Sequence, residues 1–381
     1  MIKKSYLLSP GPTPVPPESL SISSEPVIHH RTPEFSKIFM EVSEDLKYVF
    51  QTKEEVYILL SSGTGAMEAA VVNTLSPGDK VLVINGGKFG ERWRDIAKAY
   101  GLNVLEITLE WGEPYSKEEL KDELKKDPAI KAVLATLSET SSGSVYDVKG
   151  YGEVCDEFNA ILIVDAISGL GATPCPMDEW KIDILVAASQ KALMIPPGLA
   201  YLAFSRKAWK MAENSRLPKF YFDVKKYKKN LEKQTTPFTP AVSLVIQQKK
   251  SLDIIKSFRL EQIIRHHSIL GEATRQGIKA LNLELLSKIP GNIATAVKVP
   301  SGIDGGKLVK LMQGKYLAYI AGGQEPYKGK IFRIAHLGYM SAFDIITALS
   351  SLEMTLDELG YKVPFGASVA AAEKIFKENW Q

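Results

Sequence analysis

The sequence predicts an α/β protein in which a large domain, built on a mostly parallel sheet, is followed by a smaller C-terminal α+β domain. Short apolar runs rich in β-branched residues alternate with longer amphipathic stretches between residues 56 and 188, and such alternation favours a parallel sheet. Runs such as AILIVD and DILVAAS are apolar throughout, which is typical of strands covered by helices on both faces. A length of 381 residues is too long for one ordinary domain and fits two.

The predicted elements begin after an N-terminal arm. Five prolines stand between Ser9 and Pro17, so this segment is expected to be extended. The first helix is predicted over residues 35–50, with Thr32 and Pro33 as its cap and first turn. The large domain then continues with strands at 56–60, 80–84, 104–107, 132–136, 161–165 and 184–188, and with helices at 65–75, 90–100, 117–125 and 150–158.

The pattern changes after the lysine-rich segment KKYKKNLEK. A long helix is predicted over residues 243–265, followed by a helix that ends near 281. Strands at 294–299 and 330–336 and a final helix at 341–359 complete the α+β part. We therefore divide the chain into an arm (1–14), a large domain (15–258) and a small domain (259–381).

Composition excludes several classes of function. Hydrophobic residues make up 45% of the chain and charged residues 24%, as in soluble globular proteins. The net charge is only +3, which argues against a nucleic-acid or membrane partner. No signal peptide or membrane span is expected, and two cysteines fit a reducing compartment, so we expect a cytoplasmic protein. No His/Cys cluster has zinc spacing, and no metal site is predicted.

A glycine-rich turn is the first candidate binding feature. The segment SSGTGAMEAA follows the apolar run VYILL and opens a helix, and the N–H groups of such a helix terminus can bind an anion. It is not a dinucleotide fingerprint, because Glu68 replaces the third glycine. The segment GGQEPYKGKI fails as a P-loop, because Ile331 stands where Ser or Thr must bind Mg²⁺. The sequence therefore indicates a phosphate pocket without nucleotide machinery.

Two charged residues follow apolar strands farther along the chain. Asp165 ends ILIVD, at the edge of a parallel sheet where ligands bind. Taken alone, it could equally be a helix cap or a Mg²⁺ ligand. Lys191 follows DILVAASQ, where burial would lower its pKa and make the amine a nucleophile. A surface lysine is the alternative. Together, the phosphate turn, Asp165 and Lys191 indicate pyridoxal phosphate chemistry.

With these residues in place, the sequence resembles the class V aminotransferases of fold type I, close to the serine–pyruvate and alanine–glyoxylate aminotransferase group. The resemblance runs from about residue 6 to residue 360. Its matching segments are LLSPGPTPVPP, SSGTGAMEAAVVNTLSPGD, NGGKFGER, ETSSGS, ILIVDAISGLG, DILVAASQKALMIPPG and FRIAHLG. It implies a sheet of the seven-stranded type and pyridoxal 5′-phosphate as the cofactor.

The resemblance also implies roles for individual residues around the cofactor. Lys191 would carry the cofactor and move the substrate proton, and Asp165 would keep the ring nitrogen protonated. The other cofactor contacts would be Ser62, Gly63, Thr64 and Gln190 at the phosphate, Phe89 and Ile167 on the two faces of the ring, and Thr140 beside the ring hydroxyl or the substrate. Many relatives have tryptophan in place of Phe89.

Substrate binding and dimer formation follow from the same resemblance. Arg333 would bind the substrate carboxylate through its bidentate guanidinium, which lysine could not reproduce. Gly11 would lie against the same carboxylate and close the site, and Thr140 is the third expected substrate contact. Thr236 and Thr239, in TTPFTP, would reach from one subunit of a homodimer to the phosphate of the other. The sequence shows no second arginine placed for a dicarboxylate substrate.

The function that the sequence predicts is therefore a homodimeric transaminase. It would move an amino group from a small amino acid, such as alanine, serine or glycine, to glyoxylate or pyruvate. One alternative is an aspartate or aminophosphonate transaminase, or a lyase, with the same cofactor. The other is a non-catalytic subunit of a redox complex of the hydrogenase type, although two cysteines make direct redox metal chemistry improbable.

Overall fold

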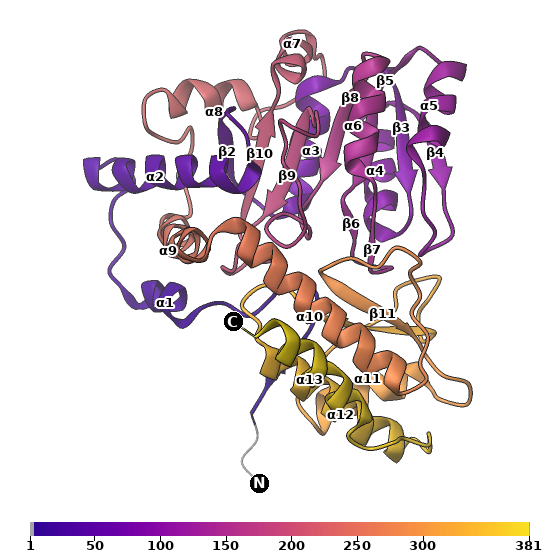
Figure 1. Cartoon of the computed structure of the whole chain (residues 1–381). Coiled ribbons are helices and arrows are strands. Elements are labelled where there is room, and N and C mark those ends of the chain that lie inside the picture. The colour runs from indigo at the N-terminus through magenta and orange to yellow at the C-terminus, as the bar shows by residue number, and fades with distance from the viewer. Residues whose placement is uncertain (1–3, 381) are drawn as a thin grey trace.

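A seven-stranded sheet forms the centre of the larger part of the computed structural model, which describes residues 4–380 (Figure 1). Its strands, in spatial order, are β2 (Val56–Leu60), β10 (Leu199–Phe204), β9 (Ile184–Ala188), β8 (Ile161–Asp165), β5 (Ile130–Thr136), β3 (Lys80–Asn85) and β4 (Asn103–Thr108). Strand β10 runs antiparallel to β2 and β9, and the remaining pairs are parallel. The predicted α/β class with a mostly parallel sheet is confirmed.

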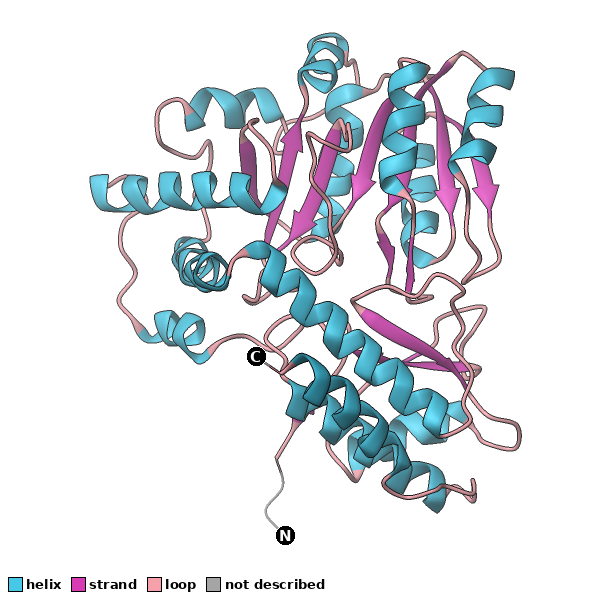
Figure 2. Cartoon of the chain, in the orientation of Figure 1, coloured by secondary structure: helices cyan, strands magenta, loops and turns pink. Residues whose placement is uncertain are grey.

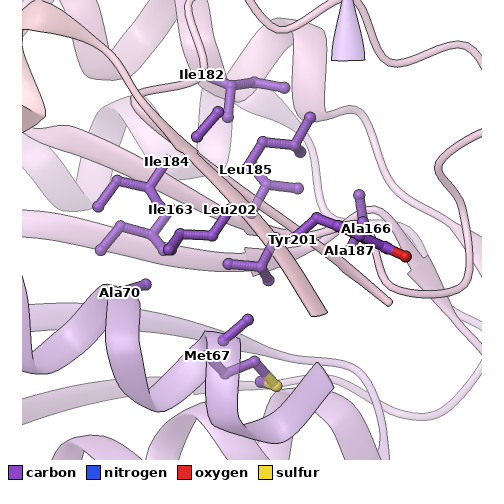
Figure 3. Close-up of a cluster of buried hydrophobic side chains, with 14 of the residues drawn as sticks. Met67, Ala70, Ile163, Ala166, Ile182, Ile184, Leu185, Ala187, Tyr201 and Leu202 are labelled. Carbon is purple, nitrogen blue, oxygen red and sulfur yellow. The ribbon is translucent and has the colours of Figure 1, made fainter. Parts of the chain in front are cut away.

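Helices cover both faces of this sheet (Figure 1). They are α3 (Gly63–Thr74) and α4 (Lys88–Ala99) on one face, and α5 (Lys117–Lys126) and α6 (Val148–Glu157) on the other. Figure 3 shows Met67 and Ala70 of α3 facing Ile163, Ile184 and Leu202 of the strands. All five side chains are fully buried. Burying an aliphatic side chain of this size contributes roughly 1.5–3 kcal/mol, so this contact fixes the start of α3 beneath the sheet edge.

The remaining elements of the larger part surround the sheet. They are α1 (Pro17–Leu20), the 3₁₀ helix η1 (Ser21–Ser24), α2 (Pro33–Phe50), the hairpin β6 (Ser138–Glu139) and β7 (Ser144–Val145), α7 (Arg206–Asn214), α8 (Val224–Leu231) and α9 (Val242–Phe258). The predicted cap of α2 is confirmed, because the Thr32 side chain accepts a hydrogen bond from the Phe35 N–H at 3.3 Å.

The smaller part contains an antiparallel sheet in the order β11 (Ala294–Lys298), β14 (Ile331–Ala335) and β13 (Ala321–Gly322). Its helices, cyan in Figure 2, are α10 (Leu260–Ala280), α11 (Gly305–Gly314), α12 (Ala342–Glu358) and α13 (Ala367–Asn379). The N-terminal arm joins this part: β1 (Tyr6–Leu7) pairs in parallel with β12 (Ala318–Tyr319), and Leu8 lies in its hydrophobic core.

Two predictions of elements are wrong. The helix predicted over residues 243–265 is broken at Arg259, whose φ of +65° is incompatible with a helix, and the N–H of Leu260 donates to the Tyr48 hydroxyl at 2.8 Å. Apolar periodicity continues across the break and does not reveal it. The helix predicted at 341–359 is not the last one, because α13 follows. Strand β10 was not predicted, because no helix separates it from β9.

Two separate hydrophobic cores support a division of the chain into a larger and a smaller part, but they do not fix the residue at which the two parts meet. One buried cluster spans residues from Phe35 to Leu260, and a second contains Leu8 and residues from Leu270 to Phe376. Helix α10 contributes to both. We therefore keep the boundary at residue 258 as a proposal. No helix within residues 4–380 is long and apolar enough to cross a membrane.

Candidate active site

The predicted site residues of the large domain gather at one edge of the sheet. Strands β2, β3, β5, β8 and β9 of the large sheet run in the same direction: β3, β5, β8 and β9 pair in parallel, and β2 has the direction of β9 because β10 is antiparallel to both. The carboxyl ends of these five strands therefore share an edge. Each of them is followed by one or more of the predicted residues, which are Ser62, Gly63 and Thr64; Phe89; Thr140; Asp165 and Ile167; Gln190 and Lys191. This is the edge at which open α/β sheets bind ligands.

Lys191 places a buried amine at this edge. Its side chain is 9% exposed, and Nζ donates a hydrogen bond to the Pro10 carbonyl oxygen at 2.5 Å. Burial lowers the pKa of Lys191 to about 8; Asp165 opposes this shift, and the cationic Arg333 and Arg92 reinforce it. Much of the amine is therefore neutral near pH 8, and a neutral amine can attack a carbonyl group.

Asp165 is the buried carboxylate of the site. Its side chain is 3% exposed, and burial raises its pKa to about 7. Oδ1 accepts a hydrogen bond from the Ile167 N–H at 2.8 Å, which is the local turn contact expected of a simple capping residue. No hydrogen bond to Oδ2 is found among residues 4–380. The residue can thus stabilise its own turn and still face a positively charged group.

The turn before α3 has the features of an anion cradle. Ser62 is the N-cap, but its side chain makes no capping hydrogen bond, so the hydroxyl is available. A Cβ on Gly63 would lie 2.5 Å from Cδ1 of Ile167, which explains the glycine. The Thr64 hydroxyl accepts a hydrogen bond from Nη1 of Arg92 at 3.2 Å.

Gln190 provides a test of whether a ligand fits here. One end of its side-chain amide is buried without a hydrogen-bond partner among residues 4–380, and buried polar groups are normally paired. The oxygen and nitrogen of an amide are assigned from their partners, so this end can be an NH₂ that faces an anion. Together with the free Ser62 hydroxyl, the Asp165 carboxylate and the Lys191 amine, it fits a phosphorylated pyridine aldehyde.

Glu139 holds the start of α4, which carries Phe89, in place beside the site. It is fully buried, and its carboxylate accepts hydrogen bonds from the N–H groups of Phe89 and Gly90 at 3.1 Å and from Ser141. Burial raises its pKa. Because Phe89 and Gly90 lie in the first turn of α4, Glu139 caps this helix from another strand and thereby fixes the position of Phe89.

Arg333 lies at the junction of the two parts. It is 7% exposed, and burial lowers its pKa to about 10 against the opposing effect of Glu139. Nε and Nη2 donate to the Gly322 carbonyl at 3.2 and 2.7 Å, and Nη1 donates to the Thr140 carbonyl at 2.9 Å. A guanidinium has five N–H donors, so one remains on Nη1 and one on Nη2. A substrate carboxylate can bind to these two.

Two other predicted substrate contacts lie beside these groups. The Thr140 hydroxyl is 2.7 Å from that of Ser168, in the loop after β8. A Cβ on Gly11 would lie 2.0 Å from Nζ of Lys191, so the arm crosses directly over the amine. The Thr13 hydroxyl, in the same arm, donates to the Lys191 carbonyl at 3.0 Å.

Thr236 and Thr239 are not brought to this site within one chain. The Thr236 hydroxyl donates to the Phe238 carbonyl at 2.7 Å. Thr239 is exposed, in a groove that also contains His29 and His30. Neither side chain hydrogen-bonds to another predicted site residue within residues 4–380. Their proposed contact with the phosphate of a partner subunit stays a prediction.

Sequence reasoning missed Arg92, Glu139, Ser168 and Thr13. Arg92 could have been found, since it lies three residues after Phe89 and therefore on the same helix face. Glu139 directly precedes Thr140, but a lone glutamate in a strand gives no sign of the helix that it caps. Within residues 4–380, no group of three or more His, Cys, Asp or Glu side chains could hold a metal ion.

Known proteins resemble this chain over nearly its whole length. The family model described as "Aminotransferase class-V" matches residues 5–323. The chain is 43% identical to the "Soluble hydrogenase 42 kDa subunit" of Anabaena cylindrica, over 99% of this chain and 100% of that one. It is 35% identical to the serine–glyoxylate aminotransferase of Methylorubrum extorquens, over 99% and 97% of the two chains.

A solved structure covers the same extent. The crystal structure of ureidoglycine–glyoxylate aminotransferase from Bacillus subtilis superposes with a TM-score of 0.94 at 29% identity, over 99% of both chains. The family model and the full-length relatives together show that this chain belongs to the class V aminotransferases, enzymes of the pyridoxal phosphate-dependent fold type I.

Proposed function

We propose that this protein is a transaminase that uses pyridoxal 5′-phosphate to move an amino group from a small amino acid to a 2-oxo acid such as glyoxylate or pyruvate. The observation that carries the proposal is the buried Lys191 amine, which shares the sheet edge with Asp165 and the α3 anion cradle. No other lysine in residues 4–380 is both this deeply buried and shifted in pKa to about 8.

The residues that would hold the cofactor follow from the geometry. Ser62, Gly63, Thr64 and Gln190 would bind its phosphate, and Phe89 and Ile167 would lie on either side of its ring. When bound, pyridoxal phosphate supplies an aldehyde that combines with amines and a ring that withdraws electrons from the substrate Cα.

The chain's own groups would then control protons and orientation. Asp165, a buried carboxylate, would hold a proton on the ring nitrogen, because a negative charge beside that atom favours its cationic form. The two free N–H groups of Arg333 would bind the substrate carboxylate and fix the direction of the Cα–H bond. Lys191, once its amine is released, would remove that proton and return it.

Two observations support a small substrate and a glyoxylate-type acceptor. The arm crosses Lys191 at Pro10 and Gly11, leaving little room above the amine. The names of the Methylorubrum and Bacillus proteins both include glyoxylate. A panel of amino donors, including aspartate, tested against glyoxylate and pyruvate would identify the preferred pair.

Borohydride reduction followed by peptide mapping tests the cofactor attachment. The expected result is a pyridoxyl group on the peptide that contains Lys191, and Lys191→Ala should lose both the label and transamination while it stays folded. Lys210→Ala is the matched control, because Lys210 lies on the surface helix α7. A pyridoxyl group on any other lysine would contradict the assignment.

We also propose a homodimer in which Thr236 and Thr239 complete the partner's phosphate site. The exposure of Thr239 and of the neighbouring Val27 supports this arrangement. Sedimentation at micromolar concentration should show a dimer, and an active monomer would reject it.

The second candidate function, a subunit of a redox complex, is favoured only by the names of relatives such as the Anabaena protein. The purified chain distinguishes the two candidates: an enzyme of the first kind absorbs visible light, is bleached by borohydride and transaminates without a partner.

A further inference from the structure

Arg92 contacts both walls of the cofactor site. It lies in α4, three residues after Phe89. Nη1 donates to the Thr64 hydroxyl at 3.2 Å, and the guanidinium carbon lies 4.8 Å from the centre of the Phe89 ring. Thr64 belongs to the anion cradle and Phe89 to the wall beside the ring. One side chain therefore connects two residues that reach the site from different elements.

Arg92 forms no salt bridge within residues 4–380. The other partly buried charged residues of α4 are paired: Lys88 with Glu91 at 2.7 Å, and Arg94 with Asp95 and Glu106. Arg92 is partly buried, yet its side-chain hydrogen bond goes to the neutral Thr64 hydroxyl. Partly burying a charge without an opposite charge is unfavourable. This arrangement is expected where a ligand supplies the anion.

The contact with Thr64 also sets the direction of a hydroxyl. A threonine hydroxyl has one O–H donor and two acceptor sites. Because Thr64 accepts from Arg92, its own hydrogen is left to donate elsewhere. Thr64 lies in the first turn of α3, where unpaired backbone N–H groups and the helix dipole favour an anion. The hydroxyl is thus available as an additional donor at the same place.

The charge of Arg92 reaches the rest of the site as well. It contributes to the lowered pKa of Lys191, and it opposes the raised pKa of Asp165. Both effects agree with the position of the guanidinium between Thr64 and the Phe89 ring.

We propose that Arg92 is a positioning residue for the cofactor phosphate. Its guanidinium supplies the positive charge at the phosphate end of the site and orients the Thr64 hydroxyl as a donor. This inference rests on the proposed function, since it requires pyridoxal phosphate as the ligand. It assigns to α4 a part in phosphate binding, in addition to α3 and Gln190. The alternative, that Arg92 binds a second carboxylate of the substrate, makes a different prediction.

A comparison of pyridoxal phosphate with pyridoxal, which lacks the phosphate, tests the proposal. The dissociation constants of both for the apoprotein are measured by absorbance titration in the parent and in Arg92→Gln. The parent should prefer the phosphorylated form, and Arg92→Gln should reduce that preference by about 10- to 100-fold, the usual range for a lost charged hydrogen bond. Its affinity for pyridoxal should stay close to that of the parent.

Two further variants sharpen the result. Arg92→Lys keeps the charge without the planar guanidinium, so its preference for the phosphorylated form should lie between those of the parent and Arg92→Gln. This variant also tests the proposal if Arg92→Gln fails to fold. Arg94→Gln is the matched control, because Arg94 lies on the same helix but pairs with Asp95 and Glu106. It should leave the preference unchanged. Inorganic phosphate should compete with pyridoxal phosphate less effectively in Arg92→Gln than in the parent.

Three outcomes separate the possibilities. Equal weakening of both ligands in Arg92→Gln would show a purely structural role and overturn the proposal. Unchanged dissociation constants with a raised KM for aspartate would show a substrate contact and also overturn it. If borohydride mapping finds no pyridoxyl group on Lys191 of the parent, the proposed function itself fails, and this result does not depend on any Arg92 variant.

Discussion

The ε-amino group of Lys191 donates a hydrogen bond to the carbonyl oxygen of Pro10, although 181 residues separate them in the sequence. Pro10 follows β1, which pairs with β12 of the smaller part, whereas Lys191 follows β9 of the large sheet. The arm therefore connects the two parts directly above the amine. A change in the arm should affect the reactivity of Lys191 before it affects the fold.

Gly11→Ala is the sharpest such change. Gly11 has a φ of +149°, and an added Cβ would lie 2.0 Å from Nζ and 2.7 Å from Cε of Lys191. The methyl group must displace the amine, so covalent capture of pyridoxal phosphate, followed by absorbance, should slow by roughly tenfold or more, which corresponds to about 1.4 kcal/mol.

The control for Gly11→Ala is Gly314→Ala. Gly314 ends α11, and an added Cβ there would meet no atom within 4 Å. This variant should react like the parent. Equal rates in both variants would show that the arm does not constrain the amine.

The pH dependence of capture follows from the pKa of Lys191. Burial lowers it from 10.5 to about 8, so the reactive neutral amine should become the major form above pH 8, and the capture rate of the apoprotein should rise through that value. Between these two pKa values the unfolded chain binds more protons, so this group also makes the folded state more stable as pH rises. A capture midpoint near 10 would show that the amine is not desolvated.

The candidate site could be predicted from sequence wherever a residue follows its own strand. Asp165 and Lys191 each end an apolar run, and parallel strands bring such ends to one edge. Glu139 could not be found this way. Its role depends on the N-terminal end of α4 lying beside β6, and these two segments are far apart in the sequence. Arg92 was missed for a different reason: it lies in α4 three residues after Phe89, so helix periodicity could have placed it beside the site, but that spacing was not applied.

The fold was predictable to a similar extent. Alternation identified every parallel strand of the large sheet, because each is separated from the next by a helix or a long connection. It missed β10, which runs antiparallel to β9 and follows it after a connection, residues 189–198, that contains no helix. It also missed the break at Arg259, since helix periodicity does not register one residue with positive φ.

Protonation of His267 should lower the free energy of unfolding at acid pH. It is buried; Nε2 accepts from the Gly338 N–H at 3.1 Å and Nδ1 lies 2.7 Å from the Ile263 carbonyl. Burial, together with the neighbouring His266, lowers its pKa to about 4. The stability that depends on neutral His267 is complete above its unfolded pKa of 6.5 and is lost as pH falls towards 4.

Urea unfolding near pH 7 and near pH 5 measures this effect. Linkage gives a loss of about 2 kcal/mol from His267 over that interval. His267→Gln should be less stable near pH 7 but should lose less on acidification. The buried His336, whose pKa is lowered to about 3 by burial, should still contribute in the variant. Parallel pH profiles for both proteins would exclude the linkage.

Arg333→Lys should separate substrate binding from turnover. Arg333 holds Gly322 and Thr140 through three N–H groups and leaves two for a carboxylate. A lysine ammonium has three donors on one atom and cannot do both. The KM for the amino donor should rise by about 10- to 100-fold, with a smaller change in kcat and an unchanged affinity for pyridoxal phosphate. A lower affinity for pyridoxal phosphate with an unchanged KM would show that Arg333 contacts the cofactor and not the substrate carboxylate.

Asp165→Asn distinguishes a functional carboxylate from a turn cap. Asparagine has nearly the same shape and can still accept the Ile167 N–H, which Oδ1 now accepts at 2.8 Å. It carries no charge, however, and cannot favour a proton on a neighbouring ring nitrogen. Lys191 should therefore still capture pyridoxal phosphate, whereas turnover per loaded site should fall by a factor on the order of 100 or more.

The capping role alone predicts the opposite pattern. Loss of a cap costs roughly 0.5–2 kcal/mol of stability and leaves the chemistry of the folded fraction intact. The measurement is single-turnover transamination, normalised to the fraction of sites that carry cofactor, beside urea unfolding of the same samples. Because a charge acts on the reacting group and a cap acts on the fold, only one of the two quantities should change strongly. A normalised rate within a few-fold of the parent would show that Asp165 stabilises its turn and does nothing for the reaction.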